Sequence, residues 1–154
     1  MPPYMTALGH AHLKVRDLRR SVDFYTRFFD LRVIEQVHDQ YVFLSGGALH
    51  HELALQQLGA GAAAPDASAV GLYHIAFEVP DQRSFALAWR ELNSAGIAIA
   101  AVDHRISWAM YFDDPDGNGL EIYCDTRHLP GGATLWHGQN QLLTEEMIRH
   151  ALVS

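Results

Sequence analysis

The sequence is poor in cysteine, in basic residues and in long apolar runs, and each shortage excludes a class of protein. Cys124 is the only cysteine, so an internal disulfide framework is excluded. Lys and Arg number 11 against 18 Asp and Glu, a formal net charge of −7, so the basic surface of a nucleic-acid-binding protein is not expected. No apolar run reaches the roughly 18 residues of a membrane-spanning helix. The first ten residues lack the basic and apolar regions of a secretion signal. We therefore expect a cytoplasmic protein.

Apolar residues and histidines are, by contrast, plentiful. Apolar residues make up 49% of the 154 residues, which suits one compact domain that buries a core. The ten histidines are many for this length and are a first indication of chemistry.

An internal repeat with an offset of 64 residues organises the chain. It places three residues of the first half on identical residues of the second: His10 on His74, Val15 on Val79 and Asp17 on Asp81. The segments that follow, 18–30 and 82–94, carry apolar residues at helical spacing, so each predicts an amphipathic helix. The aspartate before each helix is a predicted N-cap.

Each predicted helix is followed by three apolar segments, which predict strands over 31–36, 40–46 and 51–58 in the first half and 97–102, 107–114 and 120–125 in the second. Each half is therefore a βαβββ module. We expect a single domain over 1–133, with module 1 at about 7–58, a linker at 59–71 and module 2 at about 72–127. The small, Pro- and Gly-bearing composition of the linker favours this division.

The C-terminal segment 134–154 lies outside the repeat. Thr144 followed by two glutamates predicts a capped short helix in this appendage. This segment carries four apolar residues that must be covered from water, Leu142, Leu143, Met147 and Ile148. On that basis we expect a homodimer.

The repeat also pairs side chains that bind metals. His10 and His74 open strands, and Glu52 and Glu121 lie in the closing strands at an offset of 69 residues. Two imidazoles and one carboxylate on one side of a metal are the facial arrangement of non-haem Fe(II) oxygenases, while imidazole also suits zinc and nickel, and carboxylate suits manganese.

These residues resemble the vicinal oxygen chelate superfamily, which includes glyoxalase I, fosfomycin-resistance transferases, bleomycin-binding proteins and type I extradiol catechol dioxygenases. The resemblance rests on "GHAHLKVRDLRRSVDFYTRFFDL", "YHIAFEVPD" and "YFDDPDGNGLEIY", and covers about residues 7 to 127. It implies an α+β fold in which two βαβββ modules form one U-shaped mixed sheet around a metal site. The ligands implied are His10, His74 and Glu121.

Further matches resemble the extradiol dioxygenase branch. His51 in "HHELAL" matches the family's acid–base histidine, Tyr111 precedes the "DPDG" turn, and His104 lies upstream of that tyrosine at a spacing two residues shorter than in some members. By resemblance, Tyr111 and His104 would hydrogen-bond substrate and oxygen. The implied activity is that of an Fe(II) oxidoreductase that opens a catechol-like ring, with a small aromatic diol as partner and no nucleic acid or membrane.

Glu52 leaves an alternative open. A glutamate at this position is a fourth metal ligand in the glyoxalase branch, and it would imply a metal-dependent isomerase or lyase that works with nickel or zinc. Strand alternation predicts that His51 and Glu52 point to opposite faces, so both reach the metal only with a bulge. We favour Glu52 as a non-ligand. His12 remains a pocket residue or a rival ligand, and a metal-free protein that binds a drug or metabolite is a third interpretation.

Overall fold

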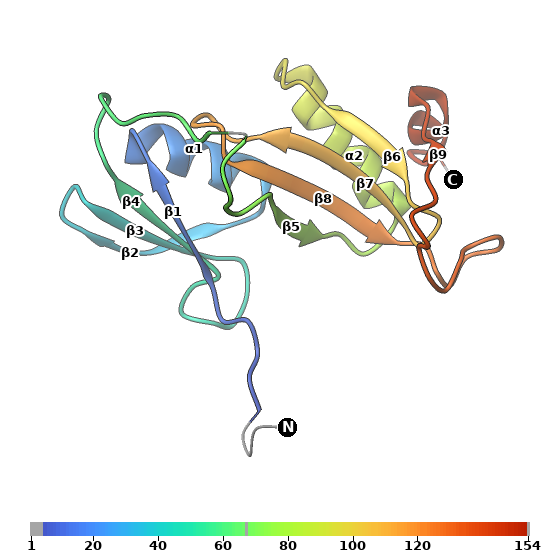
Figure 1. Ribbon diagram of the computed structural model, residues 1–154, viewed down its shortest axis with the longest axis horizontal. Helices are drawn as coiled ribbons and strands as arrows, with labels where there is room; N and C mark the ends of the chain where they lie inside the picture. Colours follow the sequence, from blue (N-terminus) through green and yellow to red (C-terminus); the bar gives the residue numbers. More distant parts are fainter. Residues whose placement is uncertain (1–4, 67, 154) are drawn as a thin grey trace. The chain divides into compact units, whose positions relative to one another are not determined.

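The computed structural model describes residues 5–66 and 68–153 and divides into two compact units, Met1–Pro65 (unit 1) and Asp66–Ser154 (unit 2). The boundary between the units falls inside the predicted linker 59–71. Both units combine helices with sheets, so the predicted α+β class is confirmed (Figure 1).

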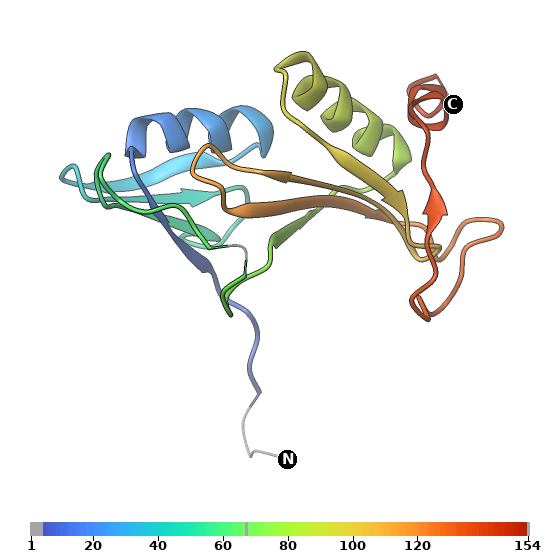
Figure 2. The ribbon, with the colours of Figure 1, turned by 45° about the horizontal axis from the view of Figure 1, so that its top comes forward.

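Unit 1 has the predicted βαβββ order. It comprises β1 (Ala11–Val15), α1 (Leu18–Phe28), β2 (Arg32–Val37), β3 (Tyr41–Ser45) and β4 (Leu53–Gln57). The strands lie in the order β1-β4-β3-β2, with β1 parallel to β4 and the other pairs antiparallel. Figure 2 shows α1 along one face of this sheet. That face holds the core of the unit, which includes Val15, Leu18, Tyr25, Leu44 and Leu55.

Unit 2 repeats this order and adds a C-terminal strand and helix. It comprises β5 (Ile75–Glu78), α2 (Gln82–Ser94), β6 (Ala100–Asp103), β7 (Ser107–Asp113), β8 (Gly119–Asp125), β9 (Gln141–Leu142) and α3 (Glu145–His150). The strands lie in the order β5-β8-β7-β6-β9. The helix α2 covers one face of this sheet (Figure 2), where Phe85, Leu92, Met110 and Ile122 are buried.

The predicted helix caps are present in both units. The carboxylate of Asp17 accepts a hydrogen bond from the Arg20 N–H at 2.9 Å, and that of Asp81 accepts one from the Ser84 N–H at 2.7 Å. The Thr144 side chain caps α3 in the same way, through the Met147 N–H. Each cap satisfies a backbone donor that the helix leaves unpaired, so the three helices begin where the sequence predicts.

The strands form two hydrogen-bonded sheets, with four strands in unit 1 and five in unit 2, and each sheet mixes parallel and antiparallel pairs. One feature of the sheets differs from the sequence prediction. The short strand β9 was not predicted, because two exposed residues carry no periodic pattern.

The C-terminal segment folds against its own unit. Leu143 and Ile148 are 5% and 1% exposed, whereas Leu142 and Met147 remain 79% and 40% exposed. The guanidinium of Arg149 lies 5.0 Å from the centroid of the Trp89 ring on α2. Two of the four apolar residues assigned to a dimer contact are therefore buried within unit 2.

Within the described residues, no helix combines the length and the apolar character needed to cross a membrane.

Candidate metal and substrate site

The clearest polar arrangement in unit 2 joins His74 to Glu121. His74 directly precedes β5, and the parallel pairing of β5 with β8 aligns Ala76 with Glu121. The Nε2 atom of His74 lies 2.9 Å from the Oε2 atom of Glu121. Glu121 is only 9% exposed. Its carboxylate has therefore lost most of its contact with water, and hydrogen-bonding partners such as His74 must replace it.

The turn before β8 fixes this pair in place. The Asp114 carboxylate accepts hydrogen bonds from the N–H groups of Asp116 and Asn118 at 2.8 and 2.9 Å. A side chain on Gly119 would overlap the carbonyl oxygen of Tyr73, so glycine allows the backbone that enters β5 to lie against β8. The "DPDGNG" sequence thus determines where His74 meets Glu121.

Tyr111 and His104 extend the arrangement across β7. The antiparallel register places Tyr111 directly opposite Glu121, and its hydroxyl donates to Oε1 at 3.2 Å. The Nε2 atom of His104 lies 2.8 Å from the same hydroxyl oxygen. Burial, and then the charge of Glu121, raise the pKa of Tyr111 to about 12, so the hydroxyl keeps its proton at neutral pH.

The chemistry of the His74–Glu121 pair fits a metal ion. Two ligands at about 2.1 Å from a metal and at right angles to each other are about 3.0 Å apart, close to the observed 2.9 Å. The Nδ1 atom of His74 is buried without a hydrogen-bond partner among the described residues. A neutral imidazole and a carboxylate are both donors that divalent iron accepts.

Unit 1 contributes a cluster of histidines. The rings of His10 and His51 are 4.4 Å apart between centroids, and the ring of Phe43 lies 4.9 Å from that of His51. The Nδ1 atoms of His50 and His51 are 2.8 Å apart. Desolvation, followed by the charges of His10 and His50, lowers the pKa of His51. His12 instead faces the edge of Tyr41, at 6.1 Å between ring centroids.

The carboxylate of Glu52 is engaged by a loop of its own unit. Its Oε2 atom accepts a hydrogen bond from the Gly46 N–H at 3.1 Å, and its Oε1 atom lies against Gly47. Glu52 precedes β4, which begins at Leu53, and therefore lies outside the strand in which it was predicted.

Strand register also corrects the pairing of Glu52 with Glu121. In unit 1, parallel pairing aligns His12 with Ala54; in unit 2, it aligns Ala76 with Glu121. Because His12 and Ala76 are equivalent in the repeat, the counterpart of Glu121 is Ala54. The predicted offset of 69 residues is therefore wrong for these strands.

The same register gives the counterparts of two other residues. Glu52, two positions before Ala54, corresponds to Gly119, two positions before Glu121. Phe43 pairs with Ala54 as Tyr111 pairs with Glu121, so Phe43 is the counterpart of Tyr111.

The predicted site residues therefore form two groups. His74, Glu121, Tyr111 and His104 come together in unit 2, while His10 and His51 come together in unit 1. Within residues 5–66 and 68–153, no set of three or more His, Cys, Asp or Glu side chains is grouped so as to hold a metal ion.

Two residues that lie beside His104 are not identified by any pattern in the sequence. The Nδ1 atom of His104 lies 2.6 Å from the Oδ1 atom of Asn140, which also accepts a hydrogen bond from the Trp136 indole N–H at 3.0 Å. Asn140 and Trp136 lie in the C-terminal segment outside the repeat, and no local pattern links them to His104.

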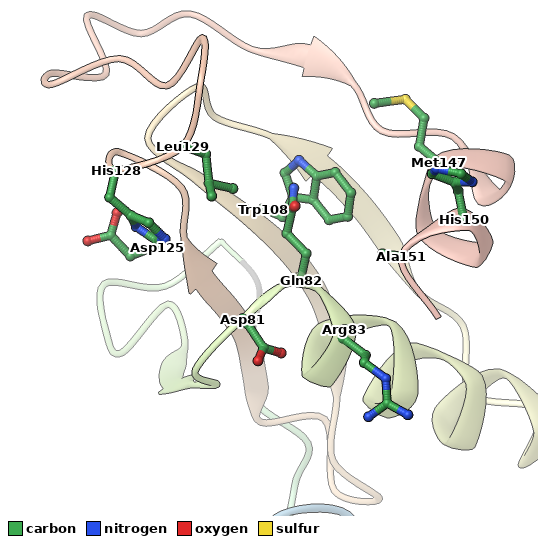
Figure 3. A pocket seen from close by; sticks show the side chains of 10 residues that line it. All are labelled: Asp81, Gln82, Arg83, Trp108, Asp125, His128, Leu129, Met147, His150 and Ala151. Carbon is green, nitrogen blue, oxygen red and sulfur yellow. The ribbon is translucent and has the colours of Figure 1, made fainter. Parts of the chain in front are cut away.

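A cavity of about 530 Å³ lies elsewhere in unit 2, between the start of α2, α3 and the end of β8, with Trp108 in its wall (Figure 3). None of the predicted site residues lines it. Trp108, Met110 and Phe112 are buried, and alternation along β7 places them on the face opposite Tyr111.

Comparisons with known proteins agree with this architecture. The family model of the Glyoxalase/Bleomycin resistance protein/Dioxygenase superfamily matches residues 7–122. The chain belongs to this superfamily.

Two curated relatives and one solved structure show what the chain is similar to. Catechol-2,3-dioxygenase of Bacillus subtilis (strain 168) is 37% identical over 120 residues, which are 78% of this chain and 42% of the relative. Biphenyl-2,3-diol 1,2-dioxygenase 2 of Rhodococcus globerulus is 28% identical over 131 residues, 83% of this chain and 67% of the relative. The glyoxylase/bleomycin resistance protein/dioxygenase domain from Frankia sp. EAN1pec has a TM-score of 0.67 at 25% identity, over 79% of this chain and 99% of that one. The match thus covers less than half the length of the catechol dioxygenase.

Proposed function

We propose that this protein is an Fe(II)-dependent extradiol-type dioxygenase that opens the ring of a catechol-like substrate. The observation that carries the proposal is the buried Glu121 carboxylate, which contacts both His74 and Tyr111 while its counterpart in unit 1 is Ala54. The similarity to a catechol dioxygenase at 37% identity supports the same activity and an aromatic diol as substrate.

The proposed metal ligands are His10, His74 and Glu121. Three protein ligands leave three positions of a six-coordinate ion for substrate and oxygen. When bound, Fe(II) would hold the diol and dioxygen and favour loss of a hydroxyl proton from the diol. Manganese, nickel and zinc are the other divalent ions that such donors accept.

Side chains of this protein would transfer the protons and donate hydrogen bonds during the reaction. His51 has its Nδ1 atom beside that of His50. The proposal requires His51 to donate in this contact, so that its Nε2 atom can accept the second proton of the diol and later return it. Tyr111 keeps its hydroxyl proton and can turn it toward an oxygen of the substrate. His104, which contacts that hydroxyl through Nε2, would orient it.

A glyoxalase-like lyase or isomerase is the alternative, and it requires Glu52 as a fourth ligand. The hydrogen bond from Gly46 to the Glu52 carboxylate and the register match of Glu52 with Gly119 favour three ligands instead.

Oxygen consumption tests the proposal. The Fe(II)-loaded protein, given a panel of catechols, should take up oxygen and form a yellow ring-opened product. The alternative would be supported, and the proposal overturned, if catechols are inert and a nickel- or zinc-loaded protein is active without oxygen.

We also propose that the chain forms a homodimer. Leu142 and Met147 leave apolar surface exposed on β9 and α3. Light scattering at micromolar concentration should give twice the chain mass, and a monomeric mass would reject the dimer.

A further inference from the structure

The C-terminal segment reaches His104 through a regular strand register. β6 and β9 are antiparallel and pair Asp103 with Gln141, so the next residues outward are His104 and Asn140. The backbone of His104 is itself held by a hydrogen bond from its N–H to the Ser107 carbonyl at 2.9 Å. The imidazole and the Asn140 amide are therefore placed side by side by backbone pairing, independently of their own contact.

A tight turn places Trp136 against the same amide. The Gln139 N–H donates to the Trp136 carbonyl at 3.0 Å, and the two central residues, His137 and Gly138, have φ values of 51° and 71°. Positive φ at both central positions is what a type I′ turn requires. The indole of Trp136 also lies edge-on to the His104 ring, with centroids 5.4 Å apart.

The indole determines which way the amide points. Its N–H group can only donate, so the Asn140 atom 3.0 Å away must be the oxygen. That oxygen has no proton to give, and the His104 Nδ1 atom lies 2.6 Å from it. The contact is a hydrogen bond only if Nδ1 carries a proton.

We propose that Asn140, oriented by Trp136, is a positioning residue that keeps a proton on Nδ1 of His104. The nitrogen that gains and loses a proton is then Nε2, which lies 2.8 Å from the Tyr111 hydroxyl oxygen. In the neutral ring, Nε2 accepts the single hydroxyl proton of Tyr111; when Nε2 is protonated, it donates to the hydroxyl oxygen and the hydroxyl donates to Glu121 Oε1. A segment outside the repeat thereby selects the nitrogen that faces the candidate site. The effect on turnover rests on the proposed dioxygenase activity, whereas the proton position does not.

Long-range ¹H–¹⁵N NMR spectra of the full metal-free chain, labelled in its histidines, test the proposal directly. The His104 signals are assigned by their loss in His104→Gln. The neutral wild-type ring should carry its proton on Nδ1. In Asn140→Leu, which removes the acceptor, the proton should spread to Nε2, and in Asn140→Asp, which keeps an acceptor, it should stay on Nδ1. Gln139→Ala, an exposed neighbour in the turn, is the matched control and should leave the spectrum unchanged.

A second variant keeps the proposal testable if Asn140→Leu does not fold. Trp136→Phe retains a ring beside His104 but lacks the indole N–H, so the amide can rotate and the Nδ1 proton should again be partly lost. A wild-type ring with its proton on Nε2, or unchanged spectra in both variants, would overturn the proposal.

Turnover supplies the functional readout. Oxygen uptake with catechol should fall about tenfold in Asn140→Leu, less than the roughly 10²–10⁴ expected for loss of an acid–base group. KM should change little, and Asn140→Asp should restore most of the rate. An Asn140→Leu enzyme as fast as wild type would refute the positioning role. If wild type takes up no oxygen while its spectrum shows the Nδ1 proton, the proposed function fails and the proton assignment stands.

Discussion

The two units share a backbone plan but differ in the side chains they carry on it. Where unit 2 has the carboxylate of Glu121 and the hydroxyl of Tyr111, the register of unit 1 has Ala54 and Phe43. Unit 1 instead groups imidazoles, with the His51 ring 4.4 Å from that of His10 and 4.9 Å from that of Phe43 between centroids.

This difference follows from the cost of burying charge. A carboxylate that is 9% exposed needs hydrogen-bonding partners, and His74 and Tyr111 provide them in unit 2. Ala54 needs none, and the rings of Phe43, His10 and His51 lie near one another in unit 1. In the proposed function, one half of the duplicated fold would supply the anionic ligand and the other the acid–base histidine.

Removal of His51, the proposed acid–base histidine, should have the largest effect on turnover. We expect His51→Ala to bind as much iron as wild type but to lose about 10²–10⁴ in rate, because proton transfer typically contributes that much. Oxygen uptake and elemental analysis on the same sample measure the two quantities. His38→Asn, which alters an exposed turn histidine of the same unit, is the control. Full activity in His51→Ala would place the proton acceptor elsewhere.

Substitution of the two equivalent aromatic residues, Tyr111 in unit 2 and Phe43 in unit 1, should show how the two units differ in their contribution to turnover. Tyr111→Phe removes the hydroxyl between Glu121 and His104, and a hydrogen bond to a charged group is worth about 1.5–3 kcal/mol, or about 10- to 100-fold in rate. Phe43→Tyr adds a hydroxyl at the matching position of unit 1, where the register partners are Ala54 on β4 and Glu35 on β2. Because neither partner is a proposed metal ligand, this variant should give no compensating gain. Steady-state rates with catechol decide between these outcomes. Equal losses in both variants would contradict the division of roles.

A glycine exchange tests how the fold positions His74. Gly119→Ala should lower the free energy of unfolding by about 1–3 kcal/mol, because the added methyl group overlaps the Tyr73 carbonyl. Gly61→Ala is the control, since nothing lies within 4 Å of its added methyl. Urea unfolding of both variants measures the difference. A neutral Gly119→Ala would show that β5 does not need this close approach.

The smallest expected effect concerns the helix caps. Hydrogen bonds from Ser84 lower the pKa of Asp81 below its usual value of 3.8, so its contribution to stability is present above that value and is lost as the pH falls through the lowered pKa. The unfolding temperature of Asp81→Ala should therefore be slightly lower than that of wild type at pH 7. In acid the two unfolding temperatures should become equal. Thermal unfolding across this pH range measures it, and a gap that persists in acid would refute the assignment.

Local sequence patterns predicted most of the helices and strands, but they did not predict contacts between residues far apart in the chain. Asp17, Asp81 and Thr144 were recognisable as caps because capping depends on residues only three positions apart. Asn140 was not recognisable, because its contact with His104 spans 36 residues and depends on a two-residue strand. Such a contact leaves no periodic trace in the sequence.

The pairing of Glu52 with Glu121 failed for a different reason. It matched two identical residues, whereas strand register follows the buried apolar positions. Leu53 and Leu55 of β4 are buried, as are Leu120 and Ile122 of β8, and aligning them places Ala54 on Glu121. Greater weight on the apolar pattern would have given the correct match.

The metal content of two glutamate variants tests the central claim, that unit 2 alone supplies the carboxylate ligand. After Fe(II) loading without oxygen, elemental analysis should find about one ion per chain in wild type and in Glu52→Gln, and a large loss in Glu121→Gln. Retention of iron in Glu121→Gln, or its loss in Glu52→Gln, would contradict the account.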